Sequence, residues 1–357
     1  MLTDAFFRRY EDVQLFSTFG ELQRRFCGQM AQLITHEVHL RNDKAFKERA
    51  KDPAISGLTL SHDRIARELG VSALSPAHFE HFVGFGEYRR KQWSRYLVET
   101  IICNYLNTPP TENTNFDLYM KHRLSLIEQA FQIRADQIAL RRAGLIIMLN
   151  NQSGGSDGEL IFDNISPKNV WTSTRDAIVD DHVKFVSQIV ELNERFRQAK
   201  MPLSFHNNLI QMSDDTLIEE EIERPFWSIV SDAKWTNVDL QMKEALDHRD
   251  RGERNSVSSA MNALESAIKT ISDVRGWTTG TEKGAAHFID NLVKERDGVR
   301  FITVWEKDAL VKLFGDIRNA FGHGPSSGQP LPSLLPEQTA WAIDSCMVWI
   351  KNLVRRA

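Results

Sequence analysis

Hydrophobic residues recur at helical spacing along most of the chain. Near its start, five apolar residues follow one another at intervals of three or four: Phe19, Leu22, Phe26, Met30 and Leu33. Such spacing lines one face of a helix, so residues 1–40 are predicted to be helical with one loop. Further helices are predicted over residues 61–70, with Ser61 as cap and Gly70 as end, and over residues 75–82, 86–106, 115–149 and 175–199.

Strands are expected at two places. Residues 203–212 surround the pair Asn207-Asn208, and asparagine tolerates the positive φ angles of a two-residue hairpin turn. Residues 159–162 are a second, shorter candidate. The predicted fold class is therefore mainly α, with an N-terminal helical domain that carries a small β-hairpin.

An acidic stretch marks the predicted domain boundary. The aromatic content changes after it, because six of the eight tryptophans lie in residues 222–357. We therefore divide the chain into residues 1–221 and residues 222–357. In the second part, helices are predicted over residues 237–249, 257–271, 281–296, 310–321 and 336–355, which is enough for a compact helical bundle. The acidic residues of the boundary are Asp214, Asp215, Glu219, Glu220, Glu221 and Glu223.

The composition is that of a globular protein, with 41% hydrophobic and 26% charged residues among 357. No apolar run approaches the roughly 20 residues that span a membrane, and the N-terminus has no secretion signal. Three scattered cysteines argue against a disulfide framework, so a cytoplasmic location without membrane contact is expected. The net charge is −4, and residues 222–357 hold 18 acidic and 18 basic residues, so strong electrostatic binding of a long duplex is not expected.

Several segments resemble known site motifs without completing them. In His36-Glu37-Val38-His39 the second histidine comes one residue too early for a zinc-protease helix, and no third ligand lies near His78 and His81. Gly84-Phe85-Gly86 lacks the third glycine of a dinucleotide loop, and residues 154–158 lack the Lys-Ser/Thr of a phosphate-binding loop. We therefore expect neither a metal site nor a cofactor.

Residues 63–72 have the pattern of the first helix and turn of a helix-turn-helix. The recognition helix would then be residues 75–82, which contain no Arg, Lys, Asn or Gln to pair with base edges. A helical hairpin inside the N-terminal domain is the simpler interpretation. A DNA-binding regulator is kept as the weaker functional alternative.

The most informative stretch is residues 316–325. A predicted helix with an apolar stripe ends there, since Gly322 suits a left-handed cap and Gly324-Pro325 prevents continuation. Arg318 lies in the helix and His323 just past its end. The break at Gly322 allows the histidine to fold back toward the arginine, although a cation at a helix C-terminus also has a purely structural explanation.

This stretch resembles the signature of the HEPN ribonucleases, which runs Arg, a polar residue, three more residues, then His; here it is Arg318-Asn319-Ala320-Phe321-Gly322-His323. Other segments of the chain are similar to abortive-infection proteins of the AbiJ type. At the N-terminus this holds for residues 2–10, and in the C-terminal part for Pro225-Phe226-Trp227, residues 263–269, Gly276-Trp277-Thr278 and Gly322-His323-Gly324-Pro325. The resemblance implies a HEPN-type helical bundle in residues 222–357 and an AbiJ-type sensor or regulatory domain before it.

The implied activity is that of a metal-independent endoribonuclease of a phage-defence system. RNA supplies its own nucleophile, the 2′-hydroxyl, so the protein has to move protons and stabilise an anionic phosphorane. Histidine titrates near neutrality and suits proton transfer by His323, and the guanidinium of Arg318 suits the phosphate. Asn319 is expected to contact phosphate or the imidazole.

Glu265 is expected to orient Arg318 or to form an ordinary i,i+4 pair with Lys269. The resemblance further implies an RNA substrate, with tRNA and mRNA as candidate classes, a homodimer through the HEPN domain, and a phage-derived or antitoxin regulator. A catalytically silent HEPN module, acting as an RNA-binding or protein-interaction scaffold, is the main alternative.

Overall fold

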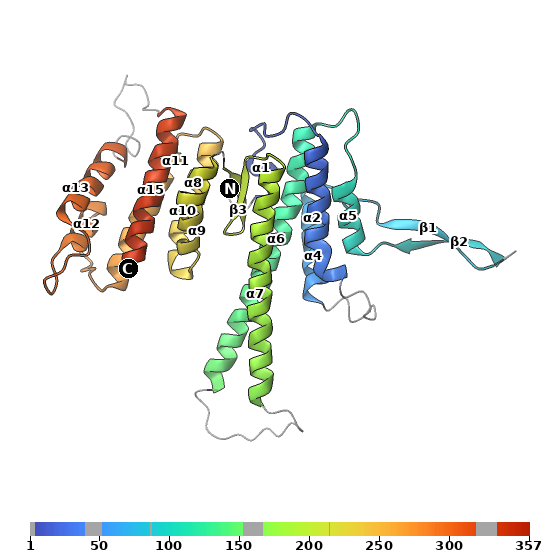
Figure 1. Cartoon of the computed structure of the whole chain (residues 1–357), viewed down its shortest axis with the longest axis horizontal. Coiled ribbons are helices and arrows are strands. Elements are labelled where there is room, and N and C mark those ends of the chain that lie inside the picture. Colours follow the sequence, from blue (N-terminus) through green and yellow to red (C-terminus); the bar gives the residue numbers. More distant parts are fainter. Residues whose placement is uncertain (1–3, 40–51, 86–87, 153–166, 214, 319–333) are drawn as a thin grey trace. The chain divides into compact units, whose positions relative to one another are not determined.

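The computed structural model describes residues 4–39, 52–85, 88–152, 167–213, 215–318 and 334–357. Within them the protein is mainly helical, as predicted, with two small two-stranded sheets. The chain divides into two compact units (Figure 1). One contains Ala5–Arg8 and Gln14–Ile210, and the other contains Met1–Asp4, Arg9–Val13 and Gln211–Ala357.

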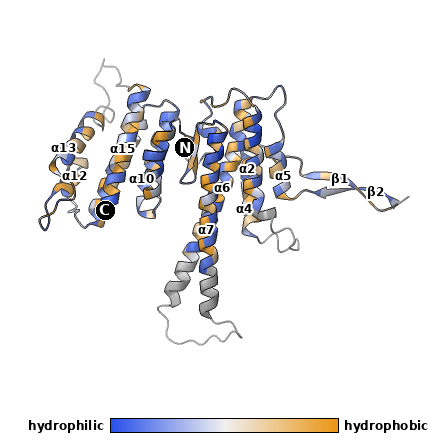
Figure 2. Ribbon diagram, in the orientation of Figure 1, coloured by the Kyte–Doolittle hydropathy of each residue, from blue (hydrophilic) through white to orange (hydrophobic). Residues whose placement is uncertain are grey.

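The N-terminal unit is built on helices whose apolar faces meet in one core. In Figure 2 every labelled helix carries both hydrophobic and hydrophilic residues, as expected of helices with one buried face. Phe26 and Phe196 stack with ring centroids 5.2 Å apart, and Ile102, Leu124 and Leu192 are fully buried. The helices of this part are α1 (Phe6–Arg9), α2 (Glu21–His39), α4 (Pro53–Glu68), α5 (Val98–Asn107), α6 (Phe116–Gln152) and α7 (Pro167–Gln198), of which the long α6 and α7 pack side by side.

Helix α4 begins earlier than the sequence pattern predicted. Asp52 is its cap, accepting a hydrogen bond from the Ala54 amide at 3.0 Å, and Pro53 occupies the first turn. Ser61 is therefore not a cap: it is buried inside the helix, where its hydroxyl donates to the Gly57 carbonyl at 2.8 Å. Gly70 does follow the helix end, with a φ of 68°.

Residues 75–97 differ most from the predicted secondary structure. Two helices were predicted there, but the structure has two antiparallel strands, β1 (His78–Val83) and β2 (Arg90–Arg95), followed by α5. The two segments pair in register over six residue pairs, and this pairing between segments that are separate in the sequence decides for strands over helices. Because the expected recognition helix is a strand, the segment is no helix-turn-helix, and the DNA-binding alternative loses its basis.

The other hairpin was predicted correctly. Strand β3 (Leu203–His206) pairs with β4 (Leu209–Met212), and the connecting Asn207 and Asn208 have φ angles of 42° and 68°. Both are left-handed, as a tight two-residue turn requires. The second strand candidate, residues 159–162, lies outside the described residues.

The C-terminal unit begins with short helical turns rather than a linker. The acidic stretch forms α8 (Thr216–Ile218) and a π-helical turn, η2 (Glu219–Glu223), in which Glu219 and Glu223 are buried. The division between the units falls after Ile210, the predicted boundary after residue 221. The remaining elements are α9 (Arg224–Val230), η3 (Ala233–Trp235), α10 (Thr236–Asp250), α11 (Ser256–Val274), α12 (Ala285–Val293), α13 (Val304–Leu313), η4 (Phe314–Arg318) and α15 (Pro336–Arg356).

These helices enclose α11, which packs against α10, α12 and α15. Trp227 and Trp235 are buried in the same core, whereas Trp341 on α15 is 63% exposed. The helix predicted over residues 237–249 is α10, which starts one residue earlier, at Thr236, after a 3₁₀ turn capped by Asp232.

A buried polar cluster joins three distant segments of the C-terminal unit. The Asp247 carboxylate on α10 accepts hydrogen bonds from the Arg9 guanidinium at 3.0 Å and from the Gln211 side chain at 2.7 Å. Nearby, Asp250 accepts from the Tyr10 hydroxyl at 2.8 Å. Breaking a buried ion pair from one side costs more than the pair itself contributes, because the remaining charge stays desolvated.

Asp247→Ala is therefore expected to lower the free energy of unfolding of the C-terminal unit by about 3–5 kcal/mol. Urea unfolding followed by tryptophan fluorescence measures this, since six tryptophans lie in residues 222–357. Asp247→Asn, which keeps an acceptor oxygen, is the matched control and should lose less. A change below about 0.5 kcal/mol in Asp247→Ala would show that the cluster is not a buried ion pair in solution.

Candidate active site

Helix α11 supplies the rigid wall of the candidate site. Its apolar residues recur at helical spacing. Five of them are completely buried in the core: Ala260, Met261, Leu264, Ile268 and Ile271. A helix buried on several sides has one orientation, because any rotation would place polar residues in the core. The side chain that α11 presents at Glu265 is therefore held in a defined direction.

Helix α13 leads into the candidate site from a well-defined start. Thr303 caps it, and the Glu306 carboxylate accepts a hydrogen bond from the Thr303 amide at 2.7 Å, which completes a capping box. The other oxygen of Glu306 pairs with Arg356 of α15 at 2.8 Å. Burial alone would raise the pKa of Glu306, but the hydrogen bonds from Thr303 and the charge of Arg356 outweigh it and lower the pKa.

The helix that carries Arg318 changes from α-helical to π-helical geometry in the five residues that end at Arg318. After α13, residues Phe314–Arg318 form the π-helical turn η4, which packs against α11. Phe314 is buried and Ile317 packs against the same core, so the turn is fixed on its apolar side. Single π-helical turns are frequent at functional sites, because they redirect the residues that follow.

The structure thus places the backbone of Arg318 at the end of an element that rests on α11. Two other predicted site residues, Asn319 and His323, lie outside the described residues, as does the helix break at Gly322. The predicted convergence of Arg318 and His323 stays a prediction.

Glu265 and Lys269 do form an ion pair. The Lys269 Nζ lies 2.8 Å from a Glu265 carboxylate oxygen, and it also lies 5.6 Å from the centre of the Phe288 ring. The pair differs from the surface pair expected in the structural interpretation, because the Glu265 side chain is only 8% exposed while that of Lys269 is 43% exposed. A buried carboxylate on the helix beside η4 is compatible with either role considered for Glu265.

Residues 4–228, more than half of the chain, match the family described as AbiJ N-terminal domain 4. The chain belongs to this family. Membership supports an abortive-infection type of protein, as the resemblance of residues 2–10 implied, and the match ends within α9. No curated protein and no solved structure shows significant similarity to the chain.

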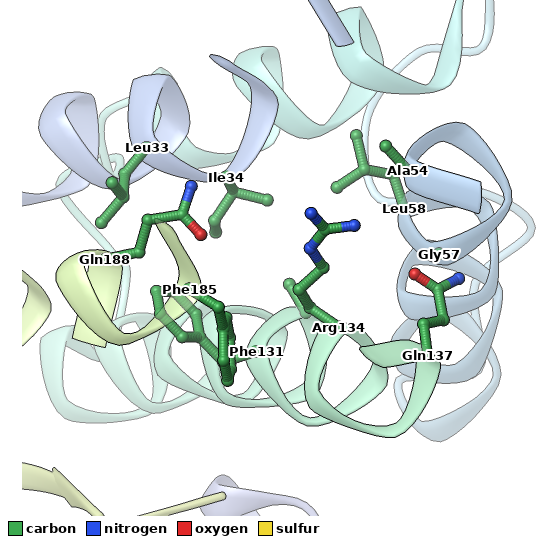
Figure 3. A pocket seen from close by; sticks show the side chains of 11 residues that line it. Leu33, Ile34, Ala54, Gly57, Leu58, Phe131, Arg134, Gln137, Phe185 and Gln188 are labelled. Carbon is green, nitrogen blue, oxygen red and sulfur yellow. The ribbon is translucent and has the colours of Figure 1, made fainter. Parts of the chain in front are cut away.

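Two hollows lie among the described residues of the AbiJ-type domain, and neither is lined by Glu265 or Lys269. The first, of about 50 Å³, lies between α2, α4, α6 and α7, and the Arg134 side chain reaches into it (Figure 3). Arg134 lies 3.7 Å from Asp181 on α7. This hollow holds a few waters at most, since ligand pockets measure roughly 300–1,000 Å³.

The second hollow, of about 400 Å³, lies beside the C-terminal end of α5 and is lined by Tyr105, Tyr119, His122 and Arg123 among others. Arg123 donates to the carbonyls of Tyr105 at 2.8 Å and Thr108 at 3.2 Å. These are carbonyls of the last turn of a helix, where a cation is stabilised by the helix dipole. The guanidinium therefore has a structural role at this end of α5, which sequence spacing alone did not indicate.

Among the described residues, no group of three or more His, Cys, Asp or Glu side chains is arranged to hold a metal ion. All three cysteines are free thiols. No described helix is both long enough and apolar enough to cross a membrane.

His122 gives the N-terminal unit a defined response to acid. Burial, followed by the positive charges of Arg123 and Arg8, lowers the pKa of His122 from 6.5 to about 4. Between these two values the unfolded chain binds a proton that the folded chain does not. The stabilising contribution of neutral His122 is therefore complete above about pH 6.5 and is lost as the pH falls toward 4.

His122→Gln is expected to flatten the fall in thermal stability between about pH 6.5 and 4. His182→Gln, at an exposed position of α7, controls for the loss of a histidine. Thermal unfolding at a series of pH values measures both. An unchanged slope in His122→Gln would refute the lowered pKa.

Proposed function

We propose that the chain is a metal-independent endoribonuclease of an abortive-infection system, with its active site in the C-terminal unit. The proposal rests on one observation above all: the sequence Arg318-Asn319-Ala320-Phe321-Gly322-His323 begins with the last residue of a π-helical turn that packs against α11. The family match adds the biological context of phage defence, since it covers an AbiJ-type N-terminal domain.

The proposed reaction is an internal transfer within RNA. The 2′-oxygen attacks the adjacent phosphorus and loses its proton to a base, while the bond from phosphorus to the 5′-oxygen breaks and that oxygen gains a proton. The products are a 2′,3′-cyclic phosphate and a 5′-hydroxyl end. His323 serves one of the proton transfers, because imidazole exchanges protons near neutral pH.

Arg318 has the complementary task of stabilising charge. Its guanidinium stays protonated at all relevant pH values and offers paired N–H donors to two phosphate oxygens. Asn319 assists by donating to phosphate or to the imidazole. Glu265 acts as a positioning residue: a carboxylate held on α11, the helix that supports η4, would orient the guanidinium through a charge-assisted hydrogen bond.

The active unit in this proposal is a homodimer in which two such helix ends form one composite cleft for RNA. Two large aromatic side chains of the C-terminal unit, Trp305 and Trp341, are 67% and 63% exposed, and exposed tryptophan is typical of protein interfaces. The N-terminal domain would restrain the nuclease or respond to a phage-derived or antitoxin regulator.

A catalytically silent scaffold is the competing function. It has no use for an arginine and a histidine at this spacing, whereas a nuclease depends on both. RNA cleavage by variants at these two positions therefore distinguishes the two functions.

His323→Ala and Arg318→Ala are each expected to reduce RNA cleavage at least about 100-fold, because each removes a group that acts on the reacting phosphate. The purified protein is incubated with cellular RNA in the presence of a chelator, and the new ends are sequenced. Circular dichroism and size-exclusion chromatography show whether fold and dimer persist. Cleavage that continues in both variants, or that stops when the chelator is added, would contradict the proposal.

Glu265→Gln tests the positioning role. Loss of one hydrogen bond between charged groups costs about 1.5–3 kcal/mol, so kcat should fall about 10-fold to 100-fold with little change in KM. Glu265→Asp should recover part of the rate. The control is Asp290→Asn, which removes an ion pair with Lys307 elsewhere in the same unit. Equal rates in Glu265→Gln and Asp290→Asn would leave Glu265 with a structural role only.

A further inference from the structure

The β1–β2 hairpin projects from the helices of the N-terminal unit beside α5 (Figure 1). Its register is defined over six residue pairs, and residues directly opposite each other share one face of the ribbon. The pairs Glu80↔Trp93 and Phe82↔Lys91 lie on the same face as the pair His78↔Arg95. We call these six residues the open face.

The two faces of the ribbon differ in their surroundings. On the opposite face Phe79 packs on Tyr96 with ring centroids 4.6 Å apart, and His81 bonds to the Ser94 hydroxyl at 2.7 Å. Those contacts join the two strands of the hairpin to each other. All six residues of the open face are exposed.

Large aromatic side chains are concentrated on and beside the open face. Trp93 is 67% exposed and Phe82 is 53% exposed, and they occupy diagonal positions, whose separation is roughly 7–8 Å. Toward the tip, Phe85 and Tyr88 are 92% and 87% exposed, the highest values among the large apolar side chains that the structure describes. An isolated ribbon gains little stability in water from such residues, and exposed apolar patches of this kind mark binding sites.

Basic residues surround these rings. Lys91 and Arg95 belong to the open face, and the Arg89 guanidinium lies 4.3 Å from the centre of the Phe82 ring. Glu80 is the acidic member of the face and pairs with Lys91 at 2.9 Å. The face therefore carries net positive charge in a chain whose net charge is −4.

We propose that the open face binds single-stranded RNA, with bases stacking on Trp93 and Phe82 and phosphates contacting Arg89, Lys91 and Arg95. Alternating cationic and aromatic side chains are what a single strand requires, because every base offers a π face and every link carries a charge. The choice of RNA rests on the proposed ribonuclease function. The hairpin would hold the strand, and the cleavage site would lie in the C-terminal unit.

Protection of a strand edge explains lysine and arginine on a hairpin, but it does not explain the aromatic residues, which promote association. A lipid surface would select aromatic and basic residues too, but it would accept an aliphatic side chain in place of an aromatic one. The difference between stacking and apolar contact is therefore the property to test.

The probe is a fluorescein-labelled oligouridine of about 16 nucleotides, the upper end of the usual site size of single-strand binders. Anisotropy titrations use the full-length chain with His323→Ala in every sample, so that cleavage cannot consume the probe. Trp93→Leu is expected to weaken binding about 5-fold to 100-fold, and Trp93→Phe much less, because only the second keeps a stacking surface. Arg89→Ala should weaken binding and lower the slope of log K against log salt by about 0.7.

Arg64→Ala, at an exposed position of α4, is the control for loss of a charge and should leave the affinity unchanged. Circular dichroism confirms that each variant folds. Equal affinities in Trp93→Leu and Trp93→Phe would overturn the inference, as would tighter binding of duplex RNA than of the single strand. So would loss of phosphatidylserine-vesicle binding, rather than RNA binding, in Trp93→Leu.

The two proposals fail separately. A chain that retains His323 and cuts no RNA, but binds the oligouridine through Trp93, refutes the ribonuclease and supports the hairpin inference. If the chain that retains His323 cuts RNA, but Trp93→Leu leaves the affinity for the oligouridine unchanged, the ribonuclease is supported and the hairpin inference is refuted.

Discussion

The buried stripe of α11 is the constraint on which the C-terminal unit depends. Because α10, α12 and α15 all pack on this helix, its rotation is fixed, and so is the direction of Glu265. The turn η4 rests on the same helix through Phe314 and Ile317. The proposed role of Arg318 would need a support of this kind, since an error of about 1 Å in the position of a catalytic group can cost on the order of 100-fold in rate.

Long amphipathic helices and the β3–β4 turn could be predicted from the sequence because their signals are local. The apolar stripe of α11 and the Asn207-Asn208 pair each indicate the local conformation from a few neighbouring residues. The helices predicted for residues 75–97 are wrong because the decisive factor there is not local: it is the pairing of His78–Val83 with Arg90–Arg95. In the acidic stretch, the position of Glu223 depends on a contact that no local pattern indicates. Glu223 is buried beside Arg249, at 3.9 Å, and that partner is 26 residues away in sequence.

In the candidate site, too, some features could be predicted from the sequence and others depend on tertiary packing. The arginine-to-histidine spacing is a sequence property and could be recognised without coordinates, whereas the burial of Glu265 and the π-helical turn before Arg318 depend on packing. The Glu265–Lys269 pair was foreseeable from its i,i+4 spacing, but the low exposure of the carboxylate was not. The open face of the β1–β2 hairpin was missed because the segment was assigned to helix, which would have scattered Phe82, Lys91 and Trp93 around two axes.

The pairing of Arg9 with Asp247 has a consequence for the order of assembly in the cell. The two residues are 238 positions apart, so at about 5–20 residues per second the ribosome adds the second roughly 10–50 seconds after the first. During this interval the segment around Arg9 has been made but its carboxylate has not. The C-terminal unit is therefore completed only when nascent α10 captures a segment made near the beginning of translation, so its folding depends on both ends of the chain.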